Sequence, residues 1–276
     1  MTTSSDCTAR IFGLDGSNPR TLTGHRRGVT SSYMIGKGRE VLTSSSDGTT
    51  RLWDVGEGIQ KRVFPSHSFS SVNVVSMGRK EVKGQDGMEL DVASNEDKLL
   101  VTGLSNGFIE GHDVLSGSSV FRLPKLLFPS GTAPQATDRW KQITSGSISS
   151  LDWSRDSNLL VAGCINGVTL AHDVRMISSE SNGSQDNGGA ALASRSLLAT
   201  WRRNEAAINE IRLLPGCKEA ILATSDGTPY RVNLVEDSPR VLEEYNGWDV
   251  DNVQSSCIDA RGRIWLAGAD GFLRMY

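Results

Sequence analysis

Apolar residues along this chain gather in short runs that end at an Asp-Gly or Asn-Gly pair. Five such runs turn rich in small residues near their ends, at residues 40–46, 98–104, 158–164, 219–225 and 263–269. Continuous apolar runs of this length are typical of strands buried on both faces of a sheet. The pair that follows tolerates the positive φ angles of a tight type I′ turn, so each run is predicted to enter a β-hairpin.

These turn pairs, called anchors from here on, recur along the whole chain. The anchors are Asp6-Cys7, Asp47-Gly48, Asn106-Gly107, Asn166-Gly167, Asp226-Gly227 and Asp270-Gly271. Consecutive anchors are 41, 59, 60, 60 and 44 residues apart. A period of this size indicates one supersecondary unit repeated along the chain.

Two further strands flank most of the hairpins. An inner strand comes before the hairpin, at residues 29–35, 72–77, 148–153, 208–214 and 253–258. A more polar strand follows it, at residues 18–23, 59–64, 118–123, 196–201 and 240–245. Four antiparallel strands per repeat are typical of the blades of a β-propeller. No segment has convincing helical periodicity, so the predicted fold class is all-β.

One repeat carries a family resemblance. Thr23-Gly24-His25, together with the run Ser-Ser-Asp-Gly-Thr-Thr-Arg-Leu-Trp-Asp at 45–54, resembles a complete WD repeat. The resemblance implies a buried hydrogen-bonded network that is structural, and each bond in it would contribute about 0.5–1.5 kcal/mol net. Its members would be His25, Ser45, Asp47 and Trp53. The other copies hold different residues in the Trp53 column: Phe12, His112, His172, Val232 and Tyr276.

The repeats predict one WD-repeat β-propeller domain over residues 1–276. Near-complete blades are expected at about 24–64, 68–123, 146–201, 206–245 and 250–276, and the outer half of another at 1–23. Because the first anchor is so close to the start, we expect a seven-bladed propeller that lacks an N-terminal part. A naturally short or oligomeric propeller is the alternative. Insertions at 79–97, 124–146 and 178–194 are predicted to be surface loops, the last one disordered.

Composition narrows the classes of partner. A net charge of −3 and a pI near 5.9 argue against a nucleic-acid or anionic-membrane surface. No run reaches the roughly 18 apolar residues that a membrane helix needs. The four cysteines, Cys7, Cys164, Cys217 and Cys257, have no CxxC spacing. Reduced and mostly buried thiols are expected, which fits the cytoplasm or the nucleus.

Two His-Asp pairs look like catalytic or metal-binding residues. His112-Asp113 and His172-Asp173 fall in the Trp53 and Asp54 columns of the repeat, so we interpret them as packed column residues. No third His, Cys or carboxylate has the spacing of a zinc site. Nucleophile-elbow, phosphate-loop and paired-carboxylate motifs are missing too. The sequence therefore predicts a chain that is not an enzyme, with no metal, no cofactor and no small-molecule substrate.

A narrower resemblance rests on residues 24–30, 36–56 and 69–75 and on the C-terminal 264–276. These stretches resemble the proteasomal ATPase-associated factor family. The resemblance implies a chaperone for assembly of the proteasome regulatory particle, which binds a proteasomal ATPase subunit through an acidic propeller face. The alternative is a WD-repeat scaffold or substrate receptor of a ubiquitin ligase or another multiprotein complex. A propeller hydrolase is disfavoured because so few histidines lie outside the column positions.

The predicted partner site lies where the anchor turns and the connections between blades share one face. The connection at 243–251 holds four carboxylates and two aromatic residues, and 201–205 adds an aromatic and mixed charge. Exposed aromatics framed by acids would suit a basic partner. The predicted partner-binding residues are Trp201, Glu205, Glu243, Glu244, Tyr245, Trp248, Asp249 and Asp251. The open alternative is that Tyr245 and Trp248 cap the blade edge and the acids are merely solvated.

Overall fold

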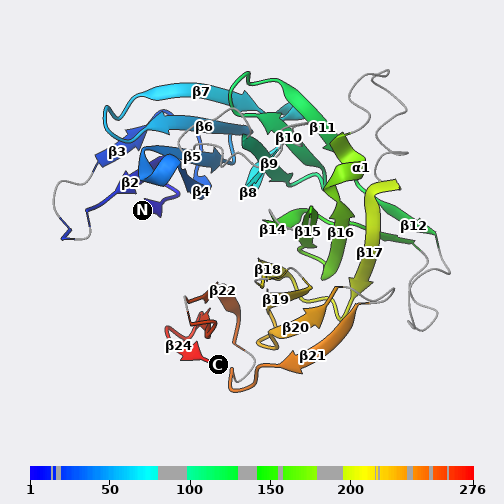
Figure 1. Cartoon of the computed structure of the whole chain (residues 1–276). Helices are drawn as coiled ribbons and strands as arrows, with labels where there is room; N and C mark the ends of the chain where they lie inside the picture. The colour runs from blue at the N-terminus through cyan, green and yellow to red at the C-terminus, as the bar shows by residue number, and fades with distance from the viewer. Residues whose placement is uncertain are drawn as a thin grey trace. The chain divides into compact units, whose positions relative to one another are not determined.

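A computed structural model describes residues 1–13, 15–16, 20–79, 98–129, 142–154, 158–178, 195–214, 216, 218–234, 239–248, 251–259 and 261–276. These residues form two compact units, 1–122 and 123–276, which are described separately (Figure 1). The single domain and the blade bounds expected from the sequence stay a prediction. Most of the predicted insertions at 79–97 and 178–194 lies outside the described residues.

The first unit consists of antiparallel sheets whose strands mostly follow one another in the chain. Its first sheet is β1 (Thr2–Thr3), β2 (Thr8–Ile11) and β3 (Arg20–Thr23). Its second sheet is β4 (Val29–Ile35), β5 (Glu40–Ser45), β6 (Thr49–Asp54) and β7 (Gln60–Pro65). Its third sheet is β8 (Val72–Arg79), β9 (Lys98–Leu104), β10 (Ile109–Asp113) and β11 (Ser119–Leu123). Short 3-10 helices are η1 (Gly36–Gly38) and η2 (His67–Phe69).

The second unit repeats this pattern. It begins with a hairpin of β12 (Leu127–Pro129) and β13 (Gln142–Thr144). The next sheet is β14 (Ile148–Ser154), β15 (Leu159–Cys164), β16 (Val168–Asp173) and β17 (Leu197–Arg202), with α1 (Val174–Ser178) after β16. Then come β18 (Ile208–Leu213), β19 (Glu219–Thr224), β20 (Tyr230–Asn233) and β21 (Arg240–Glu244). The last sheet is β22 (Val253–Ile258), β23 (Ile264–Gly268) and β24 (Leu273–Met275).

The prediction of an all-β fold built from propeller blades is confirmed. The five apolar runs became β5, β9, β15, β19 and β23, each within one residue of its predicted bounds. Within the predicted loop at 124–146, Phe128 pairs with Ile143 in a short hairpin that the sequence did not predict. The five-residue α1 was not expected either, because a single turn is too short to show a helical period. Among the described residues, no helix is long and apolar enough to cross a membrane.

The anchors form a different turn from the one predicted. Gly48 has a φ of 80°, but Asp47 is not among the residues with positive φ, so the turn is not type I′. The Gly48 N–H instead donates to the Ser45 carbonyl at 3.2 Å, which closes a turn whose last residue is left-handed. In all six anchors the Asp or Asn side chain accepts the backbone N–H two residues later. This side-chain bond fixes the turn, so only the residue that follows the Asp or Asn needs a left-handed backbone.

Each inner strand carries a bulge just after its first residue. The register shifts lie between residues 29 and 31, 72 and 74, 148 and 150, 208 and 210, and 253 and 255. A bulge leaves one residue outside the ladder, and its side chain is re-aimed. The bulged Thr30, Ser149 and Asn209 each donate to the first carbonyl of the neighbouring sheet's inner strand, on Val72, Ile208 and Val253 at 2.5, 2.6 and 2.7 Å. These bonds join consecutive sheets inside each unit.

Apolar side chains fill the space between neighbouring sheets. In the first unit Leu42 and Leu52 pack against Val75 and Leu100 of the next sheet. In the second unit Val161 and Ala171 lie in one cluster with Ile211 of the following sheet. The strands β5, β15 and β16 are buried at every position, which explains why their sequences lack alternation. The core is therefore a series of layers between blades.

Candidate protein-binding site

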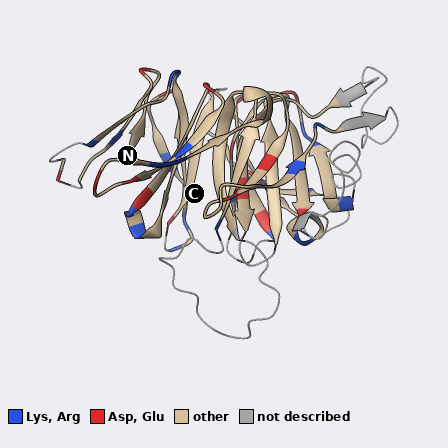
Figure 2. Ribbon diagram, turned by 90° about the horizontal axis from the view of Figure 1, so that it is seen from above, with Lys and Arg blue, Asp and Glu red and all other residues tan. Residues whose placement is uncertain are grey.

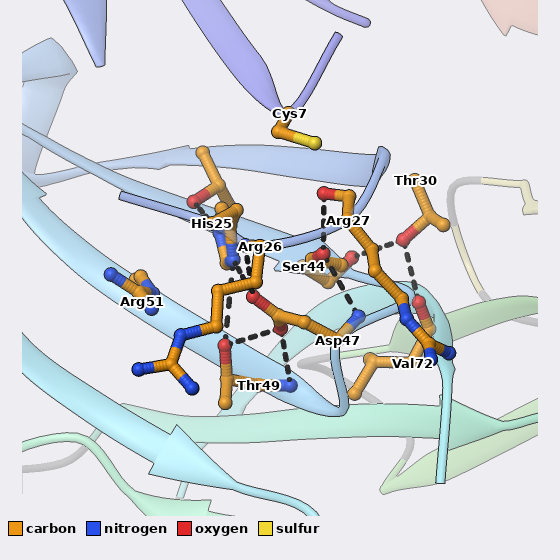
Figure 3. Close-up of polar contacts among 12 residues, drawn as sticks. Cys7, His25, Arg26, Arg27, Thr30, Ser44, Asp47, Thr49, Arg51 and Val72 are labelled. Carbon is orange, nitrogen blue, oxygen red and sulfur yellow. Dashed lines mark hydrogen bonds and ion pairs between the residues drawn. The ribbon is translucent and has the colours of Figure 1, made fainter. Parts of the chain in front are cut away.

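The anchor residue Asp47 organises the end of the second sheet. Its carboxylate accepts the Thr49 N–H at 2.9 Å and the Thr49 hydroxyl at 2.6 Å. It also accepts the Arg26 N–H at 2.9 Å and lies 3.0 Å from His25 Nδ1 (Figure 3). One side chain thereby ties the turn after β5 to the connection that leads into β4.

The network continues inward through Thr43, which the sequence reasoning did not single out. The Trp53 indole N–H donates to Thr43 Oγ1 at 2.7 Å, and His25 Nε2 lies 2.8 Å from the same oxygen. Because an ionised Asp47 can only accept, the neutral His25 ring carries its proton on Nδ1, and its Nε2 accepts from Thr43. The predicted member Ser45 lies to one side, where its hydroxyl donates to the Arg27 carbonyl and accepts the Asp47 N–H. The signal for Thr43 was its place two residues before Ser45 on the same face of β5.

The electrostatics of this network suit a permanent structural role. Burial raises the pKa of Asp47, but bonds from Thr49, Arg26 and His25 outweigh it and hold that pKa at about 2. Burial also lowers the pKa of His25 below its ordinary value, against the opposing pull of Asp47. At neutral pH the pair is therefore an ionised carboxylate bonded to a neutral imidazole. Neither the pKa of Asp47 nor that of His25 is shifted toward neutral pH, as a group that transfers protons would require.

The two His-Asp pairs occupy the strand positions predicted for them. His112 and His172 lie directly opposite Leu100 and Leu160 in their hairpins, as Trp53 lies opposite Val41. Both imidazoles are buried, and His172 Nδ1 is 3.0 Å from the Ser196 hydroxyl. Within the described part of the chain, no group of three His, Cys, Asp or Glu could hold a metal ion. The histidines are packed column residues.

The cysteines differ from expectation in one respect. Cys164 is buried in β15, and burial raises the pKa of its thiol to about 12. Cys257 is exposed, because it alternates away from the core in β22, so its predicted burial is wrong. Cys7 is half-buried at an anchor turn, and Cys217 lies outside the described residues. The described cysteines are free thiols.

The predicted aromatic anchors of the partner site are not on the surface. Tyr245 is 3% exposed and Trp248 only 1% exposed, and both pack with Val253 and Leu266 between the last two sheets. The Arg274 guanidinium lies over the Trp248 ring at 4.1 Å. Trp201 is also buried, in the cluster of the preceding sheets. The expectation that these residues are exposed is wrong, because each is the large side chain that fills a gap between blades.

The predicted carboxylates that the structure describes are exposed, but they do not all face the same side. Glu243 and Glu244 are neighbours in β21, so their side chains point to opposite faces of that strand. Glu243 lies 3.9 Å from Arg231, whereas Glu244 pairs with Arg203 at 2.7 Å. The two other exposed carboxylates are Glu205, 3.7 Å from Arg202, and Asp251; Asp249 lies outside the described residues. The partner-binding role of these acids stays a prediction.

Charge elsewhere in the described residues is mixed. Figure 2 shows acidic and basic positions interspersed along the strands and turns. Exposed ion pairs between them, such as Glu244 with Arg203, contribute little to stability. Such pairs still decide which partner charges are tolerated nearby.

Comparison with known proteins agrees with this architecture. The family "WD domain, G-beta repeat" matches residues 16–54 and 140–173. These two segments are similar to WD repeats. The first matched WD segment includes Asp47 and Trp53, and the second includes β16 with His172.

A curated relative adds a more distant likeness. It is "Nuclear distribution protein nudF" of Emericella nidulans, 34% identical over 103 residues. The match covers 35% of this chain and spans 23% of the length of that relative. WD repeats of this kind indicate a protein-interaction scaffold. Neither comparison points to the proteasomal factor family in particular.

We predict that His172 makes the second unit sensitive to acid. Burial lowers the pKa of His172 from 6.5 to about 4, so between these values the unfolded chain binds a proton that the folded chain does not. The free energy of unfolding is therefore highest above pH 6.5 and decreases as the pH falls toward 4. At pH 4.5 the decrease is about 2–3 kcal/mol. Urea unfolding of the wild type and of His172→Asn near pH 7.5 and pH 4.5 measures this loss. An equal pH dependence in both proteins would contradict it.

We predict that Trp248→Ala destabilises the second unit by about 3–5 kcal/mol, because it empties a filled gap between two sheets. The matched control is Phe272→Ala, just before β24, where the ring is 66% exposed and the expected change is within about 0.5 kcal/mol. Thermal and urea unfolding check both variants. A Trp248→Ala protein as stable as the control would contradict the buried packing role and favour the predicted role of Trp248 as an exposed contact residue.

Proposed function

We propose that this chain is a non-enzymatic scaffold that acts as a chaperone for assembly of the proteasome regulatory particle. In this role it binds a proteasomal ATPase subunit in the cytoplasm or the nucleus. The WD repeats support a protein-binding role. The ATPase partner is supported by the resemblance of residues 24–30, 36–56, 69–75 and 264–276 to the proteasomal ATPase-associated factor family.

The proposed binding site rests on two exposed carboxylates near Arg203, those of Glu244 and Glu205. Glu244 contacts the Arg203 guanidinium, and the Glu205 side chain, 70% exposed, follows two residues later in the same connection. Both carboxylates can turn toward a basic partner, since exposed ion pairs exchange at little cost. Asp251, exposed in the next connection, adds to the negative charge. Tyr245 and Trp248 are buried between the last two sheets and are not part of this surface.

The second candidate is a scaffold or substrate receptor of a ubiquitin ligase or another multiprotein complex. The acidic and basic residues interspersed along the described strands and turns favour it, because they single out no strongly basic partner (Figure 2). The two candidates differ in the protein that is bound and in the salt dependence of binding. A contact driven by the carboxylates alone weakens steeply with salt.

We predict that Glu205→Lys with Glu244→Lys weakens binding to the ATPase subunit at least about tenfold, because like charges then face each other. The measurement is biolayer interferometry with the purified chain and the purified ATPase subunits of the regulatory particle, at low and at high salt. Glu57→Lys is the matched control, a charge reversal at an exposed position of the first unit. Melting temperatures establish that all three proteins are folded.

Each outcome separates the candidates. Tight, salt-sensitive binding of one ATPase subunit that the double reversal removes supports the chaperone. Binding that survives the double reversal moves the contact away from Glu205 and Glu244. No binding to any of the ATPase subunits contradicts the chaperone, and capture of a purified ligase adaptor by the same chain would establish the alternative.

A further inference from the structure

The connection between β7 and β8 presents an aromatic side chain to solvent. Phe69, the last residue of η2, is 70% exposed, the highest value among the large apolar residues that the structure describes. A lone exposed apolar residue is common on protein surfaces and needs no explanation. Phe69 differs because of the backbone that holds it.

Two consecutive residues of this connection have a left-handed backbone. Ser68 has a φ of 60° and Phe69 a φ of 49°, and for residues other than glycine this region costs about 1–2 kcal/mol each. Strain of this kind persists only where the surroundings enforce it, and it gathers at binding sites. The backbone that carries the exposed Phe69 ring is therefore kept in a conformation that costs free energy.

Hydrogen bonds enforce this conformation from both sides. The Ser66 hydroxyl donates to the Ser70 carbonyl at 2.7 Å, and Asn106 Nδ2 donates to the Ser70 hydroxyl at 2.8 Å. The His67 N–H donates to the Glu110 carboxylate at 3.1 Å. The connection is thus fixed to the rigid sheet below it, and a partner that binds Phe69 loses little entropy in ordering it.

The anchor turn of the second sheet joins Phe69 to a pair of arginines. The Ser66 N–H donates to the Gly48 carbonyl at 2.8 Å, and a Cβ on Gly48 would lie 2.5 Å from the Phe69 carbonyl oxygen. The connection 24–28 meets the same turn, because the Arg26 N–H donates to Asp47 and the Ser46 N–H donates to the Gly28 carbonyl. The connections that carry Phe69 and Arg26 therefore meet at one anchor turn of the first unit.

Two arginines bring positive charge to the connection that meets this turn. Arg26 and Arg27 are both exposed, and Figure 3 draws no hydrogen bond or ion pair from either guanidinium. The carboxylates around them are already engaged. Asp47 accepts from His25 and Thr49, Glu110 pairs with Arg122 at 2.9 Å, and Asp6 pairs with Arg10 at 3.4 Å.

We propose that Phe69, Arg26 and Arg27 form a docking surface for an acidic segment of another protein that also carries an apolar side chain. The aromatic ring would pack against the apolar residue, and the arginines would bind carboxylates with charge-assisted bonds. Aromatic and arginine residues together are the usual anchors of protein interfaces. This surface does not depend on the proposed function, which uses carboxylates of the second unit and a basic partner.

The probe is a library of short random peptides displayed on phage and selected on the immobilised full chain. Selected peptides are then synthesised with a fluorescent label, and their dissociation constants are measured by anisotropy at low and high salt. We expect the selected sequences to be rich in Asp and Glu around an apolar residue. Arg26→Gln with Arg27→Gln, and separately Phe69→Ser, should each weaken their binding about tenfold or more.

The control is Phe272→Ser, which removes an almost equally exposed ring from the second unit and should leave binding unchanged. The arginine variant keeps both backbone bonds of the connection, so its fold should survive, and its melting temperature verifies this. Selection of basic peptides, failure to select any peptide, or binding that neither variant weakens would each overturn the proposal.

Discussion

The hydrogen bond from a bulged residue to the next sheet is the contact on which the rest of the structure depends. Inner strands of neighbouring blades run side by side, and the backbone hydrogen bonds within each sheet do not join one blade to the next. The bulge frees one residue from the ladder, and in β4, β14 and β18 its side chain reaches the neighbouring inner strand. This contact sets the position of one blade on the next within a unit. The apolar layers between blades then pack around it.

The same end of the sheets carries the anchor turns and the connections between blades. Asp47 ties a turn to the preceding connection, and Gly48 lies against the next connection so closely that a side chain would not fit. The connections are therefore ordered by the turns beneath them. Ordered, exposed connections suit protein binding, because little entropy is lost when a partner arrives. The carboxylates near Arg203 and the Phe69 surface both lie on such ordered connections, one in each unit.

Much of the fold could be predicted because its signals are local. An apolar run followed by Asp-Gly or Asn-Gly defines a buried strand and a turn within about ten residues, and the repeated spacing then supplies the blade. The turn type was mispredicted because the side-chain bond of Asp47 satisfies the turn without a left-handed Asp. The bulges left no pattern in the sequence, since a register shift depends on the partner strand.

The candidate site was harder to predict because exposure depends on tertiary packing. Tyr245 and Trp248 sit in a polar connection, which suggested surface residues, yet both fold back to fill a gap between sheets. Phe69 sits in an equally polar connection and stays exposed, because hydrogen bonds to Ser70 and Glu110 hold its backbone away from the core. Thr43 was missed for a simpler reason. Its hydroxyl lies in an apolar strand, and its place on the same face as Ser45 does not by itself show the bond that it accepts from Trp53 on the next strand.

The contact between bulge and neighbouring sheet can be tested at Asn209, whose amide donates to Asn252 and to the Val253 carbonyl. Hydrogen exchange of Asn209→Ala, with Asn246→Ala as an exposed control, reports on β18–β21 and β22–β24 separately. Asn209→Ala is expected to lower the free energy of unfolding by about 1–3 kcal/mol, and β22–β24 is expected to exchange faster than in the control. Exchange in β22–β24 that matches the control would contradict this expectation.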